Sequence, residues 1–134
     1  MDYAKRISKE EQIPAKDEDD NGVKSCAELI KSKDTFGAAP TWEWREGRKV
    51  APGMSIAPGT AIATFNDQGR YPQSESRMKH AAVFIGFTRG GILVLDQYEP
   101  GRNINYRELK WSVDDSNAHR QYVNSATNFS TIEW

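Results

Sequence analysis

The sequence predicts one α+β domain, spanning residues 1–134, in which an N-terminal helix packs on one face of a small antiparallel β-sheet. Three observations predict this class. A capped helical segment comes early in the chain, several strand-like segments follow it, and two of these are joined by a tight turn. A chain of 134 residues also has the size of a single domain and holds a hydrophobic core without disulfide bonds.

The helix prediction rests on the stretch GVKSCAELIK, residues 22–31. Ser25 is a preferred N-cap residue, and Glu28 lies three positions later, where its carboxylate closes a capping box. We therefore expect a helix from Cys26 to about Ser32. Residues 1–21 form a charged N-terminal arm with an acidic cluster ahead of an Asn-Gly turn, so we expect that arm to be exposed or to form a short helix.

The strand signals are strongest in the middle of the chain. Residues 60–65, 80–87 and 91–98 are rich in β-branched and aromatic side chains. The last two segments flank Thr88-Arg89-Gly90-Gly91, which is typical of a hairpin turn. We expect this hairpin to be the centre of the fold.

Other segments carry weaker signals. Residues 35–60 are rich in Gly, Pro and Ala and predict a long ordered loop, which in a compact domain is usually functional or packed down by its own aromatic residues. Two shorter strand candidates lie at residues 103–111 and 119–124, and the chain then ends in a predicted polar tail.

The composition argues against several function classes. Eighteen basic and nineteen acidic residues give a formal charge of −1, which offers no general attraction to a phosphate backbone, so we expect no nucleic acid partner. No apolar run approaches the roughly 18 residues of a membrane span, so we expect no membrane insertion. The start lacks the pattern of a signal peptide, so we expect synthesis in the cytoplasm.

The single cysteine, Cys26, lies at the first position of the predicted helix. Unpaired backbone N–H groups and the positive end of the helix dipole favour a thiolate there. The backbone N–H of Cys26 would also be available to an oxyanion. The alternative is that Cys26 is a small, inert core residue.

A nucleophilic thiolate needs an imidazole as its base, and the chain has two histidines. His80 opens a predicted strand, a place where catalytic groups are held on rigid backbone near a loop. Its alternative role is to cap the edge of the sheet. His119 lies in a polar segment and is predicted to be a surface histidine.

The predicted hairpin brings Asp96 and Gln97 opposite or diagonal to His80. Either side chain is able to accept a hydrogen bond from the imidazole. Asp96 is the first choice, because an acid within an apolar strand needs a partner. Alternate residues of a strand face opposite sides, so only one of the two orients His80, and Gln97 stays open as the third or a supporting residue. The sequence does not fix the register.

These segments, in order, carry a resemblance to a known family. GVKSCAELIK, PGTAIATF, GRYP, KHAAVFIGF and GILVLDQY resemble the papain-like NlpC/P60 and CHAP group of cell-wall peptidases. Within this group the chain is most similar to the small type VI secretion amidase effectors, and among them to the third family. The resemblance implies a papain-like NlpC/P60 fold with Cys26 as nucleophile, His80 as general base and Asp96 as the orienting residue.

The resemblance also implies a substrate and partners. The substrate would be the peptide stems of peptidoglycan in a rival bacterium, cut within a stem or at a cross-link, with a leaning towards the bond between D-alanine and meso-diaminopimelate. A secretion apparatus component would carry the chain to the periplasm of the target cell, and a cognate immunity protein would protect the producer. We expect no cofactor, and one cysteine with two histidines in unpaired spacing makes a poor metal site.

The long loop and the GRYP turn supply candidate substrate contacts. Guanidinium groups pair with carboxylates in bidentate fashion, and a peptide stem carries free carboxylates. The candidates are Trp42, Trp44, Arg45, Arg48, Arg70 and Tyr71. The alternative is that the arginines are solvated and the tryptophans pin the loop to the core.

Two other function classes stay open. In the first, the domain is a non-catalytic interaction module with a structural Cys26 and a Trp-rich binding loop. In the second, the same fold acts as a cysteine peptidase or transferase on another amide.

Overall fold

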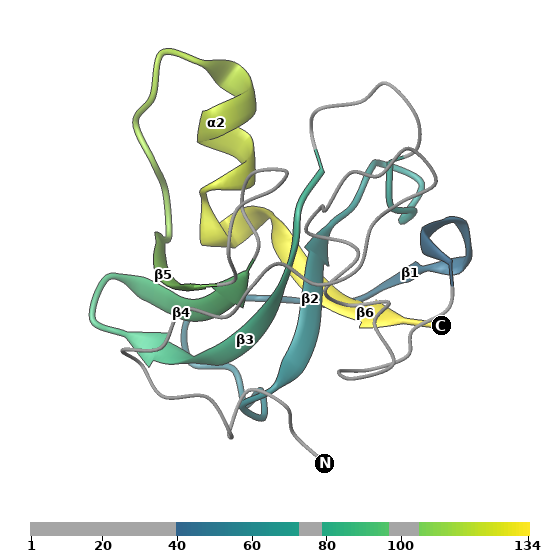
Figure 1. Ribbon diagram of the computed structural model, residues 1–134, viewed down its shortest axis with the longest axis horizontal. Coiled ribbons are helices and arrows are strands. Elements are labelled where there is room, and N and C mark those ends of the chain that lie inside the picture. The colour runs from purple at the N-terminus through teal and green to yellow at the C-terminus, as the bar shows by residue number, and fades with distance from the viewer. Residues whose placement is uncertain (1–39, 73–78, 97–104) are drawn as a thin grey trace.

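The computed structural model describes residues 40–72, 79–96 and 105–134. These ranges form one six-stranded antiparallel sheet with the order β1-β6-β2-β3-β4-β5 (Figure 1). Its strands are β1 (Arg45–Lys49), β2 (Thr60–Thr64), β3 (Ala81–Thr88), β4 (Gly91–Asp96), β5 (Asn105–Lys110) and β6 (Phe129–Glu133). The helical elements in the same ranges are η2 (Thr41–Glu43), α2 (Ala118–Val123) and η3 (Ala126–Asn128).

The predicted central hairpin is confirmed. Strands β3 and β4 pair in antiparallel fashion, and Thr88 lies opposite Gly91 across the turn. Gly91 is required by a close approach, because a Cβ atom at this position would collide with the backbone carbonyl oxygen of Leu109. The strands predicted at 60–65 and 103–111 correspond to β2 and β5.

Two secondary-structure predictions are wrong. The long loop predicted at residues 35–60 contains η2 and β1, and β1 pairs with β6. The strand predicted at 119–124 is the helix α2. Its start is fixed by Asn117, whose side-chain oxygen accepts a hydrogen bond from the backbone N–H of Arg120, an N-cap that outweighs the strand preference of Tyr122 and Val123.

The polar tail predicted after residue 124 is also wrong, because β6 lies inside the sheet between β1 and β2. Polar residues occur there because their groups are paired. The hydroxyl of Ser130, which is fully buried, donates a hydrogen bond to the Glu46 carboxylate at 2.6 Å.

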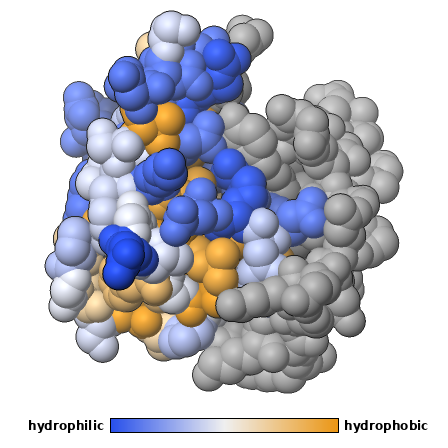
Figure 2. Space-filling view, turned by 90° about the vertical axis from the view of Figure 1, so that its left-hand side faces the viewer, coloured by the Kyte–Doolittle hydropathy of each residue, from blue (hydrophilic) through white to orange (hydrophobic). Residues whose placement is uncertain are grey.

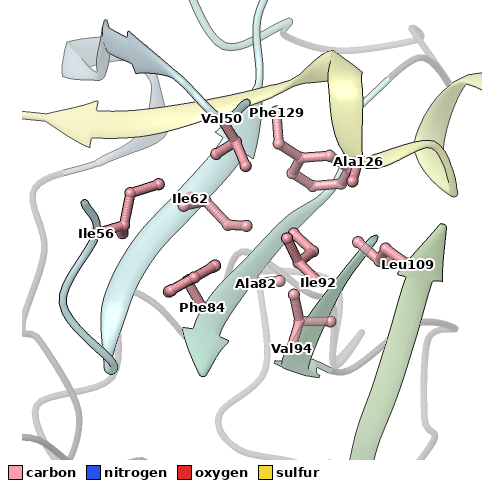
Figure 3. Packing of buried hydrophobic residues seen from close by; sticks show 10 residues of the cluster. All are labelled: Val50, Ile56, Ile62, Ala82, Phe84, Ile92, Val94, Leu109, Ala126 and Phe129. Atoms are coloured by element: carbon pink, nitrogen blue, oxygen red, sulfur yellow. The ribbon is translucent and has the colours of Figure 1, made fainter. Parts of the chain in front are cut away.

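The hydrophobic core has two parts, one on each face of the sheet, as the alternation of side chains along a strand requires. One part, the Trp44 cluster, consists of Trp44, Ala61, Ala63, Phe65, Tyr71, Ala81, Val83 and Leu95. The other, the Phe84 cluster, consists of Val50, Ile56, Ile62, Ala82, Phe84, Ile92, Val94, Leu109, Ala126 and Phe129. Figure 3 shows the side chains of the Phe84 cluster directed towards one another from β2, β3, β4 and β5 and from Phe129.

The segment containing α2 and η3 adjoins the face of the sheet that carries the Phe84 cluster, since Ala126 of η3 belongs to that cluster. The side of the molecule on which α2 and β5 lie is mostly hydrophilic in its upper half, with hydrophobic atoms gathered lower down (Figure 2). In the described ranges, no helix has the length and apolar character needed to cross a membrane. The predicted N-terminal arm and the helix at 26–32 lie outside the described residues.

Candidate active site

His80 lies directly before β3 and is almost completely buried. Its backbone is held by the end of β2: the His80 N–H donates to the Thr64 hydroxyl, and the Thr64 N–H donates to the His80 carbonyl, both at 3.0 Å. Its ring meets the ring of Phe129 edge-on, with centroids 6.1 Å apart. Both the backbone and the ring of His80 are therefore fixed by neighbouring strands.

The carboxylate of Asp96, the last residue of β4, is the hydrogen-bond partner of this imidazole. Nε2 of His80 lies 2.8 Å from Oδ2 of Asp96, and the side chains are 3% and 1% exposed. The predicted contact between these two residues is confirmed. Because a carboxylate accepts hydrogen bonds, Nε2 carries a proton, and in the neutral ring the basic lone pair is then on Nδ1.

A β-bulge in the hairpin places Asp96, and not Gln97, on the face of His80. Between the turn and Gly86 the strands pair regularly, but the register shifts between Phe84 and Gly86. If the pairing nearest the turn continued unchanged, Gln97 would be the diagonal neighbour of His80. The extra residue, Ile85, moves the register by one position and therefore brings Asp96 to that place. Gln97 itself lies outside the described residues.

Arg107 on β5 completes the environment of Asp96. Its Nε lies 3.1 Å from Oδ1 and 3.0 Å from Oδ2, and its Nη2 lies 2.7 Å from Oδ2. Its Nη1 donates to the side-chain oxygen of Asn124, the C-cap residue of α2, at 2.9 Å. Four elements, β2, β3, β4 and β5, thus meet at this cluster, and α2 is tied to it.

Sequence reasoning missed both Arg107 and Asn124. A signal for Arg107 was present: in the NYRELK strand it alternates with Leu109, so a strand with Leu109 in the core also directs Arg107 to the core face. A basic residue on such a face needs an acidic partner. Asn124 gave no comparable signal, because its contact depends on the position of α2.

The charges of this cluster determine the ionisation of Asp96. Burial by itself raises the pKa of the Asp96 carboxyl, since it disfavours the charged form. The hydrogen bonds and charges of His80 and then Arg107 act in the opposite direction and prevail, so the pKa of Asp96 lies below its usual value. Asp96 is therefore a carboxylate at neutral pH.

The predicted substrate contacts differ in exposure. Trp44 and Tyr71 are 0% and 4% exposed and pack edge-on with ring centroids 4.9 Å apart. The burial of Trp44 corresponds to the alternative in which the tryptophans pin the loop to the core, and Tyr71 packs against it there. Trp42 is 63% exposed, and Nη1 of the exposed Arg70 donates to its carbonyl oxygen at 3.3 Å. Substrate contact by Trp42 and Arg70 stays a prediction.

The other arginines of the loop are bound to backbone. Arg45 donates to the carbonyl oxygens of Glu43 and Trp44, and Arg48 donates to that of Ser55. Their guanidinium groups therefore help to shape the segment between η2 and β2.

Cys26, the predicted nucleophile, lies outside the described residues, and its role stays a prediction. His119, the other histidine, belongs to α2. A buried imidazole whose Nε2 is oriented by a carboxylate is the arrangement that serves a thiol or hydroxyl nucleophile as general base. The described residues thus include a buried imidazole and a carboxylate in the relative arrangement that such a catalyst uses.

Comparisons with known proteins place this site in a family context. The chain matches a solved structure described as "Type 6 secretion amidase effector 2 (Tae2)" with a TM-score of 0.76 and 27% identity, over 99% of this chain and 92% of that one. It is 45% identical over 74 residues to the "Type VI secretion amidase effector 2 protein" of Salmonella typhi. That match covers 55% of this chain and 53%, about half, of the relative's length.

These matches correct one prediction from the sequence, because they are to the second and not the third of the amidase effectors. The five segments on which the resemblance rested are short, so they did not separate the families. The family model of domesticated amidase effector 2 matches residues 5–132. The chain therefore belongs to the domesticated amidase effector 2 family.

Proposed function

We propose that the chain is a cysteine amidase of the papain-like NlpC/P60 type that hydrolyses an amide bond in the peptide stems or cross-links of peptidoglycan. Cys26 is the nucleophile, His80 the general base and Asp96 the residue that orients His80. Membership of an amidase effector family and the names of the two relatives support the reaction class.

The observation that carries the proposal is the 2.8 Å contact between Nε2 of His80 and Oδ2 of Asp96. Burying an imidazole and a carboxylate together is costly unless both are well paired, so a site of this kind is unusual as mere structure. The contact fixes the tautomer in which Nδ1 is the basic nitrogen. A thiol next to Nδ1 would therefore meet a base that is already oriented.

The first half of the reaction forms a thioester. Nδ1 of His80 accepts the proton of the Cys26 thiol, and the thiolate attacks the carbonyl carbon of the amide. The backbone N–H of Cys26, at the start of the predicted helix, donates to the oxyanion. As the C–N bond breaks, the imidazolium gives its proton to the leaving amine.

The second half regenerates the enzyme. His80 accepts a proton from water, the resulting hydroxide attacks the thioester carbonyl, and the Cys26 thiolate leaves and regains a proton from the imidazolium. Throughout, Asp96 stays ionised and stabilises the imidazolium through Nε2. No step in this scheme requires a cofactor.

We infer the bond and the setting from the resemblance of the sequence. The favoured bond is the cross-link between D-alanine and meso-diaminopimelate. The chain acts as a toxin that a type VI secretion apparatus delivers into the periplasm of a rival bacterium, and a cognate immunity protein protects the producing cell. The name of the Salmonella typhi relative supports delivery by this apparatus.

Digestion of purified Gram-negative peptidoglycan tests the proposal. Wild-type protein, Cys26→Ala and His80→Ala are incubated with the sacculus, and the released muropeptides are identified by mass. We expect cross-linked dimers to disappear with the wild type alone. Shorter peptide stems in place of lost dimers would mean that the enzyme class is right but that a bond within the stem is cut. Undigested peptidoglycan with all three proteins would contradict the proposal.

A further inference from the structure

The proposed mechanism leaves Arg107 without a role, although it makes more contacts to the carboxylate of Asp96 than His80 does. Three donor contacts from Nε and Nη2 reach the two oxygens of Asp96 at 2.7–3.1 Å. Oδ2 is shared, because it is also the atom 2.8 Å from Nε2 of His80. The guanidinium of β5 and the imidazole of the residue directly before β3 thus hold the same carboxylate.

The guanidinium is itself held in place. Its Nη1 donates to Oδ1 of Asn124 at 2.9 Å, and Asn124 is the C-cap of α2, with its backbone N–H directed at the carbonyl oxygens of Arg120 and Tyr122. The Arg107 side chain is 27% exposed, compared with 1% for Asp96. The planar fork of an arginine has a geometry that fixes the rotation of a carboxylate, which an ammonium group does not do.

On these contacts, we infer that Arg107 is a positioning residue of the hydrolysis. It keeps the buried carboxylate of Asp96 ionised and turned so that Oδ2 faces Nε2 of His80, and α2 fixes Arg107 through Asn124. The inference rests on the proposed function. It adds a fourth residue that acts on the reaction through Asp96 and His80 and does not touch the substrate.

The charged groups around Asp96 explain why the loss of Arg107 would affect the chemistry. Among the described residues, the charged or titratable groups that face it are His80, directly before β3, and Arg107 from β5. Without the guanidinium, the buried negative charge is balanced by His80 alone. The pair then holds a proton more tightly, so His80 is less often the neutral base at a given pH.

The test compares Arg107→Gln and Arg107→Lys with wild type on a purified cross-linked muropeptide dimer. For Arg107→Gln we expect kcat to fall about 10- to 100-fold, less than for the loss of Asp96 because Arg107 acts through Asp96, with little change in KM. The acid limb of the pH–rate profile should move to higher pH. Arg107→Lys keeps the charge but loses the fork, so its kcat should lie between the other two with the acid limb nearer to wild type.

Arg120→Gln is the matched control. Arg120 also pairs with an aspartate, Asp115, at 3.1 Å, but this pair is not buried: the two side chains are 53% and 25% exposed. We expect its kcat and pH profile to equal those of wild type. A merely structural effect of losing an Arg–Asp pair would move the thermal stability of both variants without moving the pH profile.

A spectroscopic measurement gives a second readout that does not require turnover. In ¹⁵N-labelled Cys26→Ala protein, the ring nitrogens of His80 are followed by NMR from pH 5 to 8, with His119→Gln used to assign the two histidines. We expect the His80 ring to be the Nε2–H tautomer. When Arg107→Gln is added, the titration midpoint of His80 should be higher. Arg107→Lys serves in both experiments if Arg107→Gln does not fold.

The outcomes separate this inference from the proposed function. If His80→Ala or Asp96→Asn keeps full activity, the proposed function fails and the role of Arg107 fails with it. If both lose activity while Arg107→Gln keeps the wild-type kcat, pH profile and His80 spectrum, the proposed function stands and the inference about Arg107 is overturned.

Discussion

Nε2 of His80 lies 2.8 Å from Oδ2 of Asp96, and both side chains are buried. His80 directly precedes β3 and Asp96 ends β4, so the contact joins the open ends of the two strands of one hairpin. A regular hairpin would not bring them together, since the bulge at Ile85 is needed to set the register. The contact is thus a product of the backbone geometry as much as of the residue types.

Replacing the orienting carboxylate by its amide tests its role in the chemistry. In Asp96→Asn we expect kcat to fall about 10²- to 10⁴-fold, because an amide does not fix the Nε2–H tautomer and does not stabilise the imidazolium. The measurement is the rate of muropeptide cleavage. Asp115, whose side chain is 25% exposed, gives the matched control: Asp115→Asn should keep the wild-type rate, and equal rates for both variants would show that Asp96 has a structural role only.

The same carboxyl should make stability depend on pH in the acid range. The pKa of Asp96 is lower in the folded chain than in the unfolded chain, where it is about 3.9. The ionised Asp96 therefore contributes fully to the free energy of unfolding above about pH 4. This contribution is lost as the pH falls towards the folded pKa, by up to about 1.4 kcal/mol of unfolding free energy per pH unit. Urea unfolding between pH 7 and pH 3 should show this loss of unfolding free energy in wild type and less of it in Asp96→Asn. Parallel plots of unfolding free energy against pH for the two proteins would contradict the prediction.

The two tryptophans of the WEW stretch should behave differently. Trp44 is fully buried against Tyr71, so Trp44→Ala should lower the free energy of unfolding by about 3–5 kcal/mol. Trp42 is 63% exposed, so Trp42→Ala should change it by less than about 0.5 kcal/mol. Urea unfolding measures both. A raised KM for Trp42→Ala alone would support its predicted contact with the substrate, and an unchanged KM would remove it from the site.

Adjacent glycines of the hairpin turn offer a second matched pair. A methyl group at Gly91 would collide with the backbone carbonyl of Leu109, whereas nothing lies within 4 Å of the corresponding position at Gly90. Gly91→Ala should therefore destabilise the fold by about 1–3 kcal/mol through displacement of β5. Gly90→Ala should be close to neutral. Thermal melts of the two variants compare them directly, and equal melting temperatures would mean that β5 does not pack as described.

Local sequence signals predicted the hairpin and the pairing of His80 with an acid, because both depend on residues close together in the chain. The β-branched strands and the Arg89-Gly90 turn define the hairpin, and a carboxylate within an apolar strand requires a partner. The choice between Asp96 and Gln97 was beyond the sequence, since it depends on a one-residue bulge at Ile85. Gly86, next to Ile85, is a residue type that often accompanies a bulge, but a glycine within a strand does not by itself fix the register.

Elements that are stabilised by distant contacts were missed. Strand β6 has polar residues because its neighbours pair them, as Glu46 pairs Ser130 across 84 positions of sequence. Helix α2 has only six residues, too few for a periodic pattern, and is recognised mainly by its Asn117 cap. The contact between Arg107 and Asp96 follows only from the sheet order, which places β5 next to β4. In each case the deciding contact comes from a remote part of the chain.

If the pair of His80 and Asp96 activates the thiol of Cys26, the alkylation rate of that thiol should show the activation. The chain has one cysteine, so modification by iodoacetamide, followed by intact mass, reports on Cys26 alone. A free thiol with a pKa of about 8.5 reacts slowly at pH 6. We expect the folded wild type to react much faster than this at pH 6, and His80→Ala to abolish the difference. Equal rates in wild type and His80→Ala, or a thiol that stays unreactive in both, would contradict it.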